Sequence, residues 1–577
     1  MSSSAVAGLG LDAGVLTAPR SRDLLGTELT PIDILLGRQA EMTPVERFAR
    51  LHEDDLVPAG ERWWSERLPT ALPGVGQQYA FAVDMDSCTG CKACVSACNN
   101  LNGLDGDEQW RTVTTVHGDT PAGPSVLTVT AACHHCVEPA CMAGCPVDAY
   151  EKDPITGIVA HLDDQCIGCS YCTLTCPYEV PLYNSSLGIV RKCDMCRGRL
   201  ADGEAPACVQ GCPNGAITIT VVDVDEVIEG LERDLEVAAA ADGVADRPRL
   251  VPGAPDSTLT VPTTQYRSSR TSHGSFADHR VVKPGHAHTP LAVMLTLTQV
   301  AVGTAVVDAA VSPLAAEHVP RSVPALALGV ALVALAASVG HIGRPLYAWR
   351  AILGFRHSWL SREIAAFGAF AGLGVALAGA VFLELDAALI TLLRLGTVAA
   401  GLAGVACSVM LYAVTGRRWW RVRTSSIRFA GTMAGAGGLL VAAVTLGGAV
   451  DDSTTGPIDV ATVLLLVVAA STVVSLLAAV STLARHSATV GDDLAATRQL
   501  LLGPLAGLVR LRVAASILGG VVIPLVVVLA LPADRPVGWE APGALGLALV
   551  VFTIGELFDR RLFFLASVAP RRYGDIR

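Results

Sequence analysis

Residues 166–177 read CIGCSYCTLTCP, so four cysteines are separated by two, two and three residues, and the last is followed by proline. Residues 88–98, CTGCKACVSAC, repeat the spacing. Two further quartets with longer gaps lie in 133–146 and 193–213, and both end in Cys-Pro. These quartets hold sixteen of the 17 cysteines: Cys88, Cys91, Cys94, Cys98, Cys133, Cys136, Cys141, Cys145, Cys166, Cys169, Cys172, Cys176, Cys193, Cys196, Cys208 and Cys212.

Each quartet has the ligand count of one [4Fe–4S] cluster, and the 2-2-3 spacing followed by proline is that of bacterial cluster-binding ferredoxins. Zinc is an alternative ligand of Cys-x2-Cys pairs, but it explains two-plus-two spacing better than 2-2-3 spacing. Disulfides are a second alternative, but residues 1–20 show no charged segment followed by an apolar run, so no export signal is predicted. The quartets therefore predict four clusters and a path for electrons.

In two-cluster ferredoxins the fourth cysteine of a run binds the neighbouring cluster. We therefore pair the first quartet with the last, and the two middle quartets with each other. The predicted ligand sets are set 1, Cys88, Cys91, Cys94 and Cys212; set 2, Cys133, Cys136, Cys141 and Cys176; set 3, Cys166, Cys169, Cys172 and Cys145; and set 4, Cys193, Cys196, Cys208 and Cys98. Four cations flank these ligands and either raise the cluster potentials or are ordinary solvated charges: Lys92, Arg191, Lys192 and Arg197.

Composition divides the 577-residue chain into a polar, cysteine-rich half and an apolar half. Residues 286–577 contain no lysine and a single cysteine, Cys407, which is predicted to be an inert apolar residue. The net charge of −11 without a long basic tract argues against a nucleic-acid partner. We predict four regions: an extension at 1–79, a cluster domain at 80–220, a linker or partner-binding segment at 221–288, and a membrane domain at 289–577.

Local patterns give a coarse secondary structure. Strands are predicted at 79–83 and 216–220, on either side of the quartets, and an acidic helix near 223–236. A helix start is predicted at 43–47, and an extended segment at 252–275. The predicted fold class is an α+β ferredoxin-like double dicluster domain, followed by an all-α membrane domain.

The apolar half contains eight stretches long enough to cross a bilayer, each of which needs about 20 residues. The predicted spans are 290–310, 322–341, 363–383, 389–413, 428–449, 459–483, 513–532 and 542–566. They lack the alternation that a membrane β-barrel needs, so eight transmembrane helices are expected. On the side shared with the cluster domain, segments 344–362, 417–428, 485–512 and 560–577 carry 18 arginines, against three on the other side. Cytoplasmic loops are rich in arginine, so the cluster domain is expected on the cytoplasmic face of the cell membrane.

The segments CTGCKAC, CHHCVEPACMAGCP, CIGCSYCTLTCPYEVP, RKCDMC and PACVQGCP resemble the four-cluster iron–sulfur subunits of the dimethyl sulfoxide reductase superfamily of molybdenum enzymes. Residues 340–364, GHIGRPLYAWRAILGFRHSWLSREI, and 555–564, GELFDRRLFF, are similar to the eight-helix anchor subunit of these enzymes. The resemblance implies that two subunits are fused in this chain. It also implies a separate molybdopterin-containing catalytic subunit and electron exchange with the quinone pool.

Two ionisable residues at the ends of predicted spans, His341 and Glu363, are candidates for a functional site in the membrane. The resemblance implies a quinol site there, with Glu363 the stronger candidate, and quinol oxidation needs a proton acceptor. Alternatively, Glu363 is a helix N-terminal carboxylate, and His341 binds a loop carbonyl. Glu556 and Arg560 are spaced for a structural ion pair. Arg350 and Arg362 are expected to hold their loop or to pair with carboxylates of the site.

The sequence therefore predicts an electron-transfer and membrane-anchor subunit that is not itself the terminal catalyst. Menaquinol is oxidised in the anchor, electrons pass through four clusters, and a separate molybdopterin subunit reduces a cytosolic oxide or oxyanion such as nitrate. One alternative reverses the flow, from a dehydrogenase such as a formate oxidiser to quinone. A membrane-tethered redox sensor and an anchor without a quinone site are further alternatives.

Overall fold

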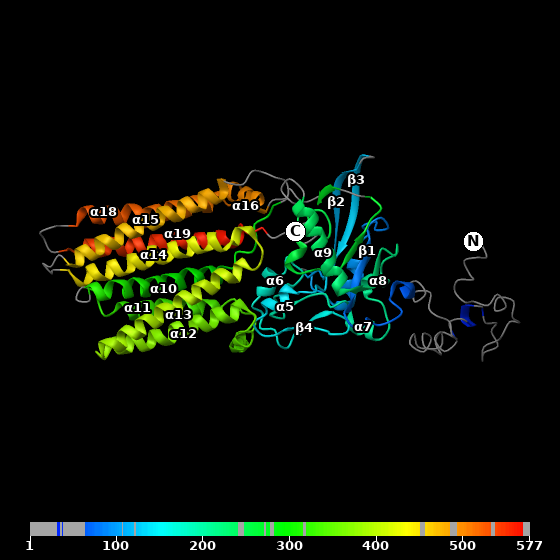
Figure 1. Ribbon diagram of the computed structural model, residues 1–577, viewed down its shortest axis with the longest axis horizontal. Coiled ribbons are helices and arrows are strands. Elements are labelled where there is room, and N and C mark those ends of the chain that lie inside the picture. Colours follow the sequence, from blue (N-terminus) through cyan, green and yellow to red (C-terminus); the bar gives the residue numbers. More distant parts are fainter. Residues whose placement is uncertain are drawn as a thin grey trace. The chain divides into compact units, whose positions relative to one another are not determined.

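The computed structural model describes residues 30, 32–34, 37, 64–106, 108–120, 123–240, 247–270, 273–276, 282–315, 319–450, 456–484, 493–531 and 537–568 (Figure 1). The chain separates into two units, Met1–Glu66 and Arg67–Arg577. The helix start predicted at 43–47 lies outside the described residues. All four quartets and the apolar helices belong to the second unit.

The two predicted strands flanking the quartets are present and pair with each other. β1 (Gln77–Asp84) and β8 (Ile217–Asp223) are antiparallel neighbours, with Val83 opposite Ile217. Their apolar side chains are largely buried, as expected of a sheet that covers a core. This pairing places the segment entering the first quartet next to the segment leaving the last one.

The segment 221–288 contributes more than a linker. It contains the predicted acidic helix as α9 (Val224–Ala240), and its later part adds a strand to each of two sheets. β9 (Gln265–Arg267) lies parallel to β1, and β10 (His273–Phe276) extends the hairpin of β2 (Thr112–Thr120) and β3 (Gly123–Ala131). This segment is therefore built into the cluster domain.

Short elements carry the quartets between these sheets. Two small hairpins, β4 (Tyr150–Lys152) with β5 (Val159–His161) and β6 (Leu182–Asn184) with β7 (Ile189–Arg191), separate successive cysteine runs. Short helices begin within or beside the runs: α4 (Ala93–Asn102), α5 (Ala140–Gly144), α6 (Tyr171–Thr175), α7 (Arg197–Ala201) and α8 (Ala207–Gln210).

The apolar half is helical, and each predicted span coincides with a helix or a continuous helical segment. These are α10 (Thr289–Ala315), α11 (Val323–Val339), α12 (Trp359–Phe382), α13 (Ala387–Ala413), α14 (Val422–Gly448), α15 (Gly456–Ala484), α17 to α18 (Ala506–Ala530, including the π-helical turn Leu518–Val522) and α19 (Glu540–Leu565). Among the described residues, seven of them are long and apolar enough to cross a membrane. α11 has 17 residues, about 26 Å, and is shorter than the roughly 30 Å of a bilayer core.

The helices pack through small residues at the centre of the bundle. A side chain on Gly303 of α10 would meet the carbonyl oxygen of Met433 in α14 at 2.2 Å. Gly437 of α14 approaches the backbone of Gly303 in the same way, at 2.4 Å. Small residues allow such close backbone approach between membrane helices, whose association the hydrophobic effect does little to favour in lipid. The glycine-rich stretch of α14 therefore has a packing function.

Candidate electron-transfer site

The structure brings together the cysteines of the predicted ligand sets. One cavity is lined by all four cysteines of set 1, a second by those of set 2 and a third by those of set 4. Each cavity combines three cysteines of one run with one cysteine of another. This grouping is the one expected from cross-ligation between neighbouring cluster motifs.

Set 3 is also gathered in one place. Cys145, Cys166 and Cys172 belong to a single buried apolar cluster, against which the partly buried Cys169 packs. The thiols of Cys169 and Cys172 interact electrostatically with each other and with those of Cys145 and Cys166. All sixteen cysteines are thus arranged in four groups.

The donor geometry fits iron–sulfur cubanes. Among the described residues, no three His, Cys, Asp or Glu side chains lie close enough together to hold a single metal ion. Sets 1, 2 and 4 instead each line a cavity of their own with four cysteines. Backbone N–H groups point at thiols, as from Gly168 to Cys166 Sγ at 3.4 Å and from Ala149 to Cys145 Sγ at 3.3 Å. Burial raises the pKa of the Cys145 thiol to about 11, so a positively charged group is needed to bind it as thiolate.

The first and third quartets have the same backbone conformation as well as the same spacing. Gly90 and Lys92 have positive φ angles of 73° and 61°, and the corresponding Gly168 and Ser170 have 71° and 58°. Gly168 also approaches another backbone, because a Cβ there would lie 2.1 Å from the carbonyl oxygen of Gly188. The glycine two residues after the first cysteine is therefore required by geometry at both positions.

The loop between α11 and α12 binds the backbone around set 3. Gly343 N–H donates to Gly168 O at 3.3 Å, Arg344 Nη1 donates to Asp163 O at 2.7 Å, and Ser358 Oγ donates to Gly144 O at 2.8 Å. Set 3 therefore lies directly against the membrane domain.

Arg350 of this loop and Arg362 in the first turn of α12 were predicted either to hold the loop or to pair with carboxylates, and both bind main-chain carbonyls. Arg350 donates to Asp164 O at 3.3 Å, and Arg362 donates to Phe355 O and Arg356 O at 3.1 and 2.5 Å. Within the described ranges, neither makes an ion pair with a carboxylate. The loop-holding alternative is the one that the structure supports.

Glu363 lies buried in the second turn of α12 and accepts a hydrogen bond from Ser408 Oγ of α13. α12 begins at Trp359, so Glu363 is not at the helix N-terminus. Tyr171 of α6 and Tyr412 of α13 lie near its carboxyl group. The Tyr171 hydroxyl also donates to Leu411 O at 2.6 Å, which joins the loop of set 3 to α13.

His341 follows the end of α11 and is partly buried. Its Nδ1 lies 2.5 Å from Ser338 O, and it also bonds to the backbone of Cys169 in set 3. Burial lowers the pKa of this imidazole, a shift that the two hydrogen bonds oppose. Among the described residues, no hydrogen bond or ion pair joins His341 to Glu363. Instead, each lies beside the 166–172 loop, His341 at Cys169 and Glu363 at Tyr171.

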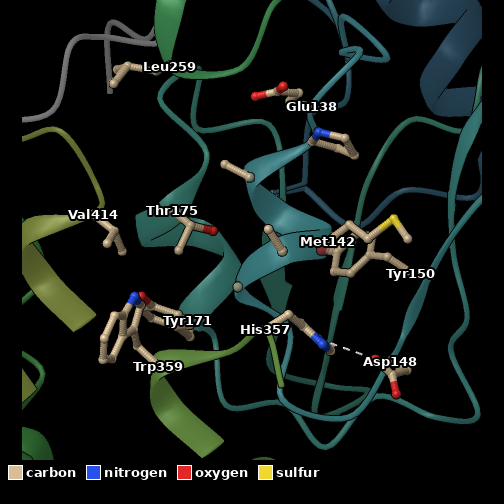
Figure 2. Close-up of a pocket in the computed structure, with 14 residues that line it drawn as sticks. Glu138, Met142, Asp148, Tyr150, Tyr171, Thr175, Leu259, His357, Trp359 and Val414 are labelled. Carbon is tan, nitrogen blue, oxygen red and sulfur yellow. Dashed lines mark ion pairs between the residues drawn. The ribbon is translucent and has the colours of Figure 1, made fainter. Parts of the chain in front are cut away.

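A cavity of about 620 Å³ lies beside α5 and α6, and Trp359 and Val414 of the membrane half are among its lining residues. Figure 2 shows these side chains. Tyr171 and Trp359 line one part, and His357 forms an ion pair with Asp148 at 3.4 Å in another. Neither Glu363 nor His341 lines it, but Trp359 precedes Glu363 by one helical turn and thus shares its face of α12. Sequence reasoning missed Tyr171 and Trp359, although the first lies inside a cysteine run.

The comparisons with known proteins agree with this geometry. Residues 125–222 match the family model "4Fe-4S dicluster domain", and residues 282–565 match "DMSO reductase anchor subunit (DmsC)". An anaerobic dimethyl sulfoxide reductase subunit of Escherichia coli K12 is 37% identical over 154 residues, which are 25% of this chain and 75% of that protein. The protein belongs to the dimethyl sulfoxide reductase iron–sulfur subunit family.

This member of the family carries both the iron–sulfur domain and the anchor, so it is a membrane protein and an electron-transfer subunit. "Probable anaerobic dimethyl sulfoxide reductase chain YnfG" of E. coli K12 is 38% identical over 148 residues, 24% of this chain and 72% of that protein. "Hydrogenase-2 operon protein HybA" of E. coli O157:H7 is 34% identical over 188 residues, 28% of this chain and 56% of that protein.

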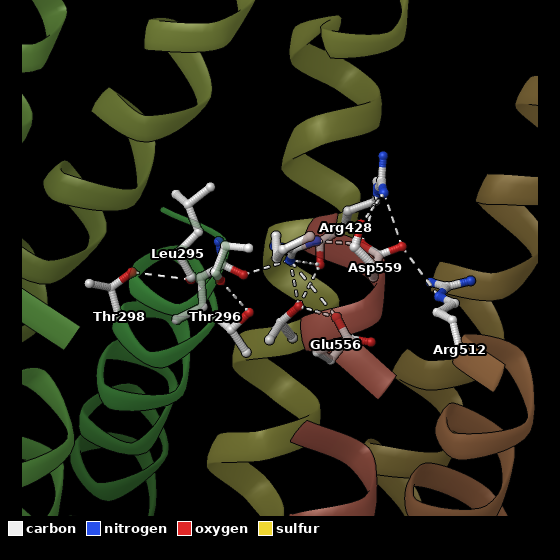
Figure 3. A network of polar contacts seen from close by, with 11 residues as sticks. Leu295, Thr296, Thr298, Arg428, Arg512, Glu556 and Asp559 are labelled. Atoms are coloured by element: carbon white, nitrogen blue, oxygen red, sulfur yellow. Dashed lines mark hydrogen bonds and ion pairs between the residues drawn. The ribbon is translucent and has the colours of Figure 1, made fainter. Parts of the chain in front are cut away.

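The anchor segment 555–564 forms a buried ionic network with three other helices (Figure 3). The predicted pair is present, with Arg560 Nη2 at 3.9 Å from Glu556 Oε2. Asp559 binds three guanidinium groups, those of Arg428 at 3.0 Å, Arg512 at 3.2 Å and Arg560. Gln299 Oε1 of α10 accepts from Arg560 Nη2 at 2.6 Å. The network therefore joins α10, α14, α17 and α19.

Proposed function

We propose that the chain carries electrons from menaquinol in the membrane, through four [4Fe–4S] clusters held by sets 1 to 4, to a separate molybdopterin-containing reductase subunit. The observation that carries the proposal is the grouping of sixteen cysteines into four sets, with set 3 against the membrane domain beside His341 and Glu363. The clusters supply one-electron carriers, and the protein fixes their order and surroundings.

The order of the sets follows from the residues between them. Tyr150 belongs to the same buried cluster as Cys172 of set 3 and Cys141 of set 2. Lys192 lines the cavity of set 2 and contacts set 4, and Arg111 interacts with thiols of set 4 and set 1. Electrons entering at set 3 thus pass to set 2, then set 4, then set 1.

Set 1 is the far end of this path and supports a docking site for the partner. Cys91 is exposed and Cys88 is partly exposed, whereas three of the four cysteines of set 4 and of set 3 are buried. A cluster near the surface is suited to passing electrons to a second protein. The similarity to subunits named for anaerobic dimethyl sulfoxide reductases supports a reductase as that partner.

At the membrane end, the chemistry requires that one quinol releases two electrons and two protons. The electrons pass singly to the cluster of set 3, and Glu363 takes a proton from a quinol hydroxyl, with His341 as the second candidate group. An apolar environment with few polar groups suits a quinone ring. The cavity lined by Tyr171 and Trp359 is the proposed place of entry for the ring (Figure 2). α11 serves as the eighth membrane span.

The proposal is tested with anaerobically purified protein. Four clusters correspond to about sixteen irons per polypeptide. A reduced menaquinone analogue should bleach the visible absorption of the clusters and produce paramagnetic signals. An iron content far below this, or no signal on chemical reduction, would contradict the proposal.

The reverse direction, from a dehydrogenase to quinone, is the second candidate. It is favoured by the similarity to HybA, whose name associates it with a hydrogenase operon. Measured cluster potentials discriminate the two directions, since potentials mostly below that of the quinone pool favour the reverse flow.

Cross-ligation gives a prediction that compares pairs of variants. Cys212→Ser should remove the same paramagnetic signal as Cys88→Ser, because both residues belong to set 1. Cys98→Ser should remove the same signal as Cys196→Ser, through set 4. Low-temperature electron paramagnetic resonance of the reduced variants measures this. If Cys98→Ser instead removed the signal lost in Cys88→Ser, each quartet would bind its own cluster.

The orientation gives a second prediction. Arg356→Cys places a thiol in the exposed loop beside the cluster domain, and Glu384→Cys places one at the opposite end of α12. With the cluster domain on the cytoplasmic face, an impermeant maleimide should label Glu384→Cys in intact cells and Arg356→Cys only in inverted vesicles. The unsubstituted protein gives the background from native thiols. The opposite labelling pattern would place the clusters outside and would remove the argument for a cytosolic acceptor such as nitrate.

A further inference from the structure

Two cations in the described part of the cluster domain are buried and form no ion pair with a carboxylate. Arg111 is 2% exposed and Lys192 is 3% exposed, and they are the only buried arginine and lysine among the described residues between 64 and 288. Neither forms an ion pair with a carboxylate in this part of the structure. A buried charge is costly unless an opposite charge compensates it. Arg111 lies over the Phe81 ring at 4.6 Å, and the Asp194 carboxylate interacts only weakly with Lys192, so a further anionic group is expected next to each cation.

Arg111 lies between set 4 and set 1. It lines the cavity of set 4, and its Nη1 donates to Thr130 Oγ1 at 3.2 Å. Thr130 in turn lines the cavity of set 1, with its hydroxyl 3.6 Å from Cys94 Sγ. The second guanidinium nitrogen of Arg111, Nη2, is buried and has no hydrogen-bond partner among the described residues. The Nη2 group of Arg111 is therefore left to donate a hydrogen bond to a cluster held in the cavity of set 4.

Lys192 lies between set 2 and set 4. It lines the cavity of set 2, with Nζ 3.6 Å from Cys133 Sγ. The same ammonium donates to the carbonyl oxygen of Cys193 in set 4 at 2.9 Å and to that of Val159. These bonds fix the ammonium at the junction of the two sets.

We propose that Arg111 and Lys192 are the internal counter-charges of the clusters at sets 1, 2 and 4, and that they raise the potentials at which these clusters accept electrons. The inference rests on the proposed function, because it requires cubanes at these sets. Reduction adds one electron to a cubane and breaks no bond, so the reduced cluster is more negative by one charge. A fixed neighbouring cation stabilises that form. Set 4 adjoins both cations, whereas set 3 adjoins neither.

The structure separates these two residues from other cations close to the ligands in sequence. Lys92 and Arg197 are exposed, so water screens their charge. Arg191 forms an ion pair with Glu108 at 3.2 Å, which largely neutralises it. Of the four cations that the sequence indicated, only Lys192 has the position of a counter-charge, and Arg111 was not among them.

The test is a redox titration of the whole membrane-bound protein, followed by electron paramagnetic resonance. Arg111→Gln should shift the midpoint potentials at sets 1 and 4 downward, and Lys192→Gln those at sets 2 and 4, with set 3 unchanged in both. The cysteine variants described above assign the signals of sets 1 and 4, and Cys136→Ser and Cys169→Ser assign those of sets 2 and 3 in the same way. Arg111→Lys and Lys192→Arg, which keep the charge, should give smaller shifts. Arg197→Gln, beside Cys196 but exposed, should give none.

Iron analysis separates the possible failures. If the glutamine variants lose clusters, Arg111→Met and Lys192→Met are titrated instead, because methionine also removes the charge. Loss of the adjacent cluster in every neutral variant, with retention in the charge-conserving ones, would also support the counter-charge role. Unchanged potentials with full iron content, or equal shifts at all four sets, would overturn it. An unsubstituted protein without clusters would instead contradict the proposed function itself.

Discussion

Replacing Glu363 by glutamine is expected to lower the rate of quinol oxidation by about 10²–10⁴-fold, the usual contribution of a positioned acid–base group. Glutamine keeps the size of the side chain and can still accept the hydrogen bond from Ser408 Oγ. It cannot take up the proton that a quinol must release. The clusters should remain intact, because Glu363 contacts none of their ligands among the described residues. The rate is measured as cluster reduction by a menaquinol analogue in stopped flow.

Two further variants define the cause of this loss. Glu384→Gln changes an exposed carboxylate at the other end of α12 and should keep the unsubstituted rate. Ser408→Ala removes the hydroxyl that donates to Glu363 without removing the carboxylate, so an intermediate rate is expected. Dithionite should reduce the clusters of all three variants normally. Undiminished quinol oxidation in Glu363→Gln would favour an anchor in which this residue has no part in the chemistry.

The cysteine grouping could be predicted from sequence because it depends on local spacing and one pairing rule. Cysteines two or three residues apart must lie on the same loop, whatever the rest of the fold does. The exchange of the fourth cysteine between the outer quartets is supported by β1 and β8, which place residues 83 and 217 opposite each other. The apolar helices were predictable for a similar reason, because the length and composition of each segment decide whether it forms a helix in lipid.

Other features depend on contacts between distant segments and have no local signal. Arg111 immediately precedes β2 and lies outside every cysteine run, so only the fold brings it between two cavities. The strands β9 and β10 are three and four residues long, and neighbouring sheets rather than their own sequences select them. Tyr171 and Glu363 lie in different halves of the chain, so their proximity could not be predicted from either motif.

The fused arrangement gives the segment 340–362 a clear physical function. It binds the backbone of the set 3 loops at several points, including Gly354 N–H to Pro146 O at 2.9 Å. Electron tunnelling falls steeply with distance, so a rigid contact here fixes the separation between set 3 and the membrane domain. The segment similar to anchor subunits is thus also the segment that holds the cluster domain. Its arginines bind carbonyls there, which accounts for part of the arginine excess on this side independently of topology.

The second large effect is expected from Asp559→Asn, which should destabilise the membrane domain by about 3–5 kcal/mol, the usual cost of removing one partner of a buried ion pair. Asp559 is 4% exposed and compensates three buried guanidinium groups (Figure 3). Without its charge, Glu556 is the carboxylate that remains in the network, 3.9 Å from Arg560. The helices α14, α17 and α19 then hold like charges close together in an apolar environment. Thermal unfolding in detergent, followed by circular dichroism, measures the loss.

Glu556→Gln and Asp459→Asn are the control variants for Asp559→Asn. Glu556 accepts a hydrogen bond from Thr432 Oγ1, which a glutamine oxygen can also accept, and its ion pair is long, so a smaller loss is expected. Asp459 lies exposed in the first turn of α15, outside the network, and its substitution should leave the unfolding temperature unchanged. If Asp559→Asn unfolded at the same temperature as Asp459→Asn, the network would not be a major source of stability. The loss in unfolding temperature should therefore be largest for Asp559→Asn, smaller for Glu556→Gln and absent for Asp459→Asn. This order follows the number of guanidinium contacts, which is three for Asp559, one long contact for Glu556 and none for Asp459 among the described residues.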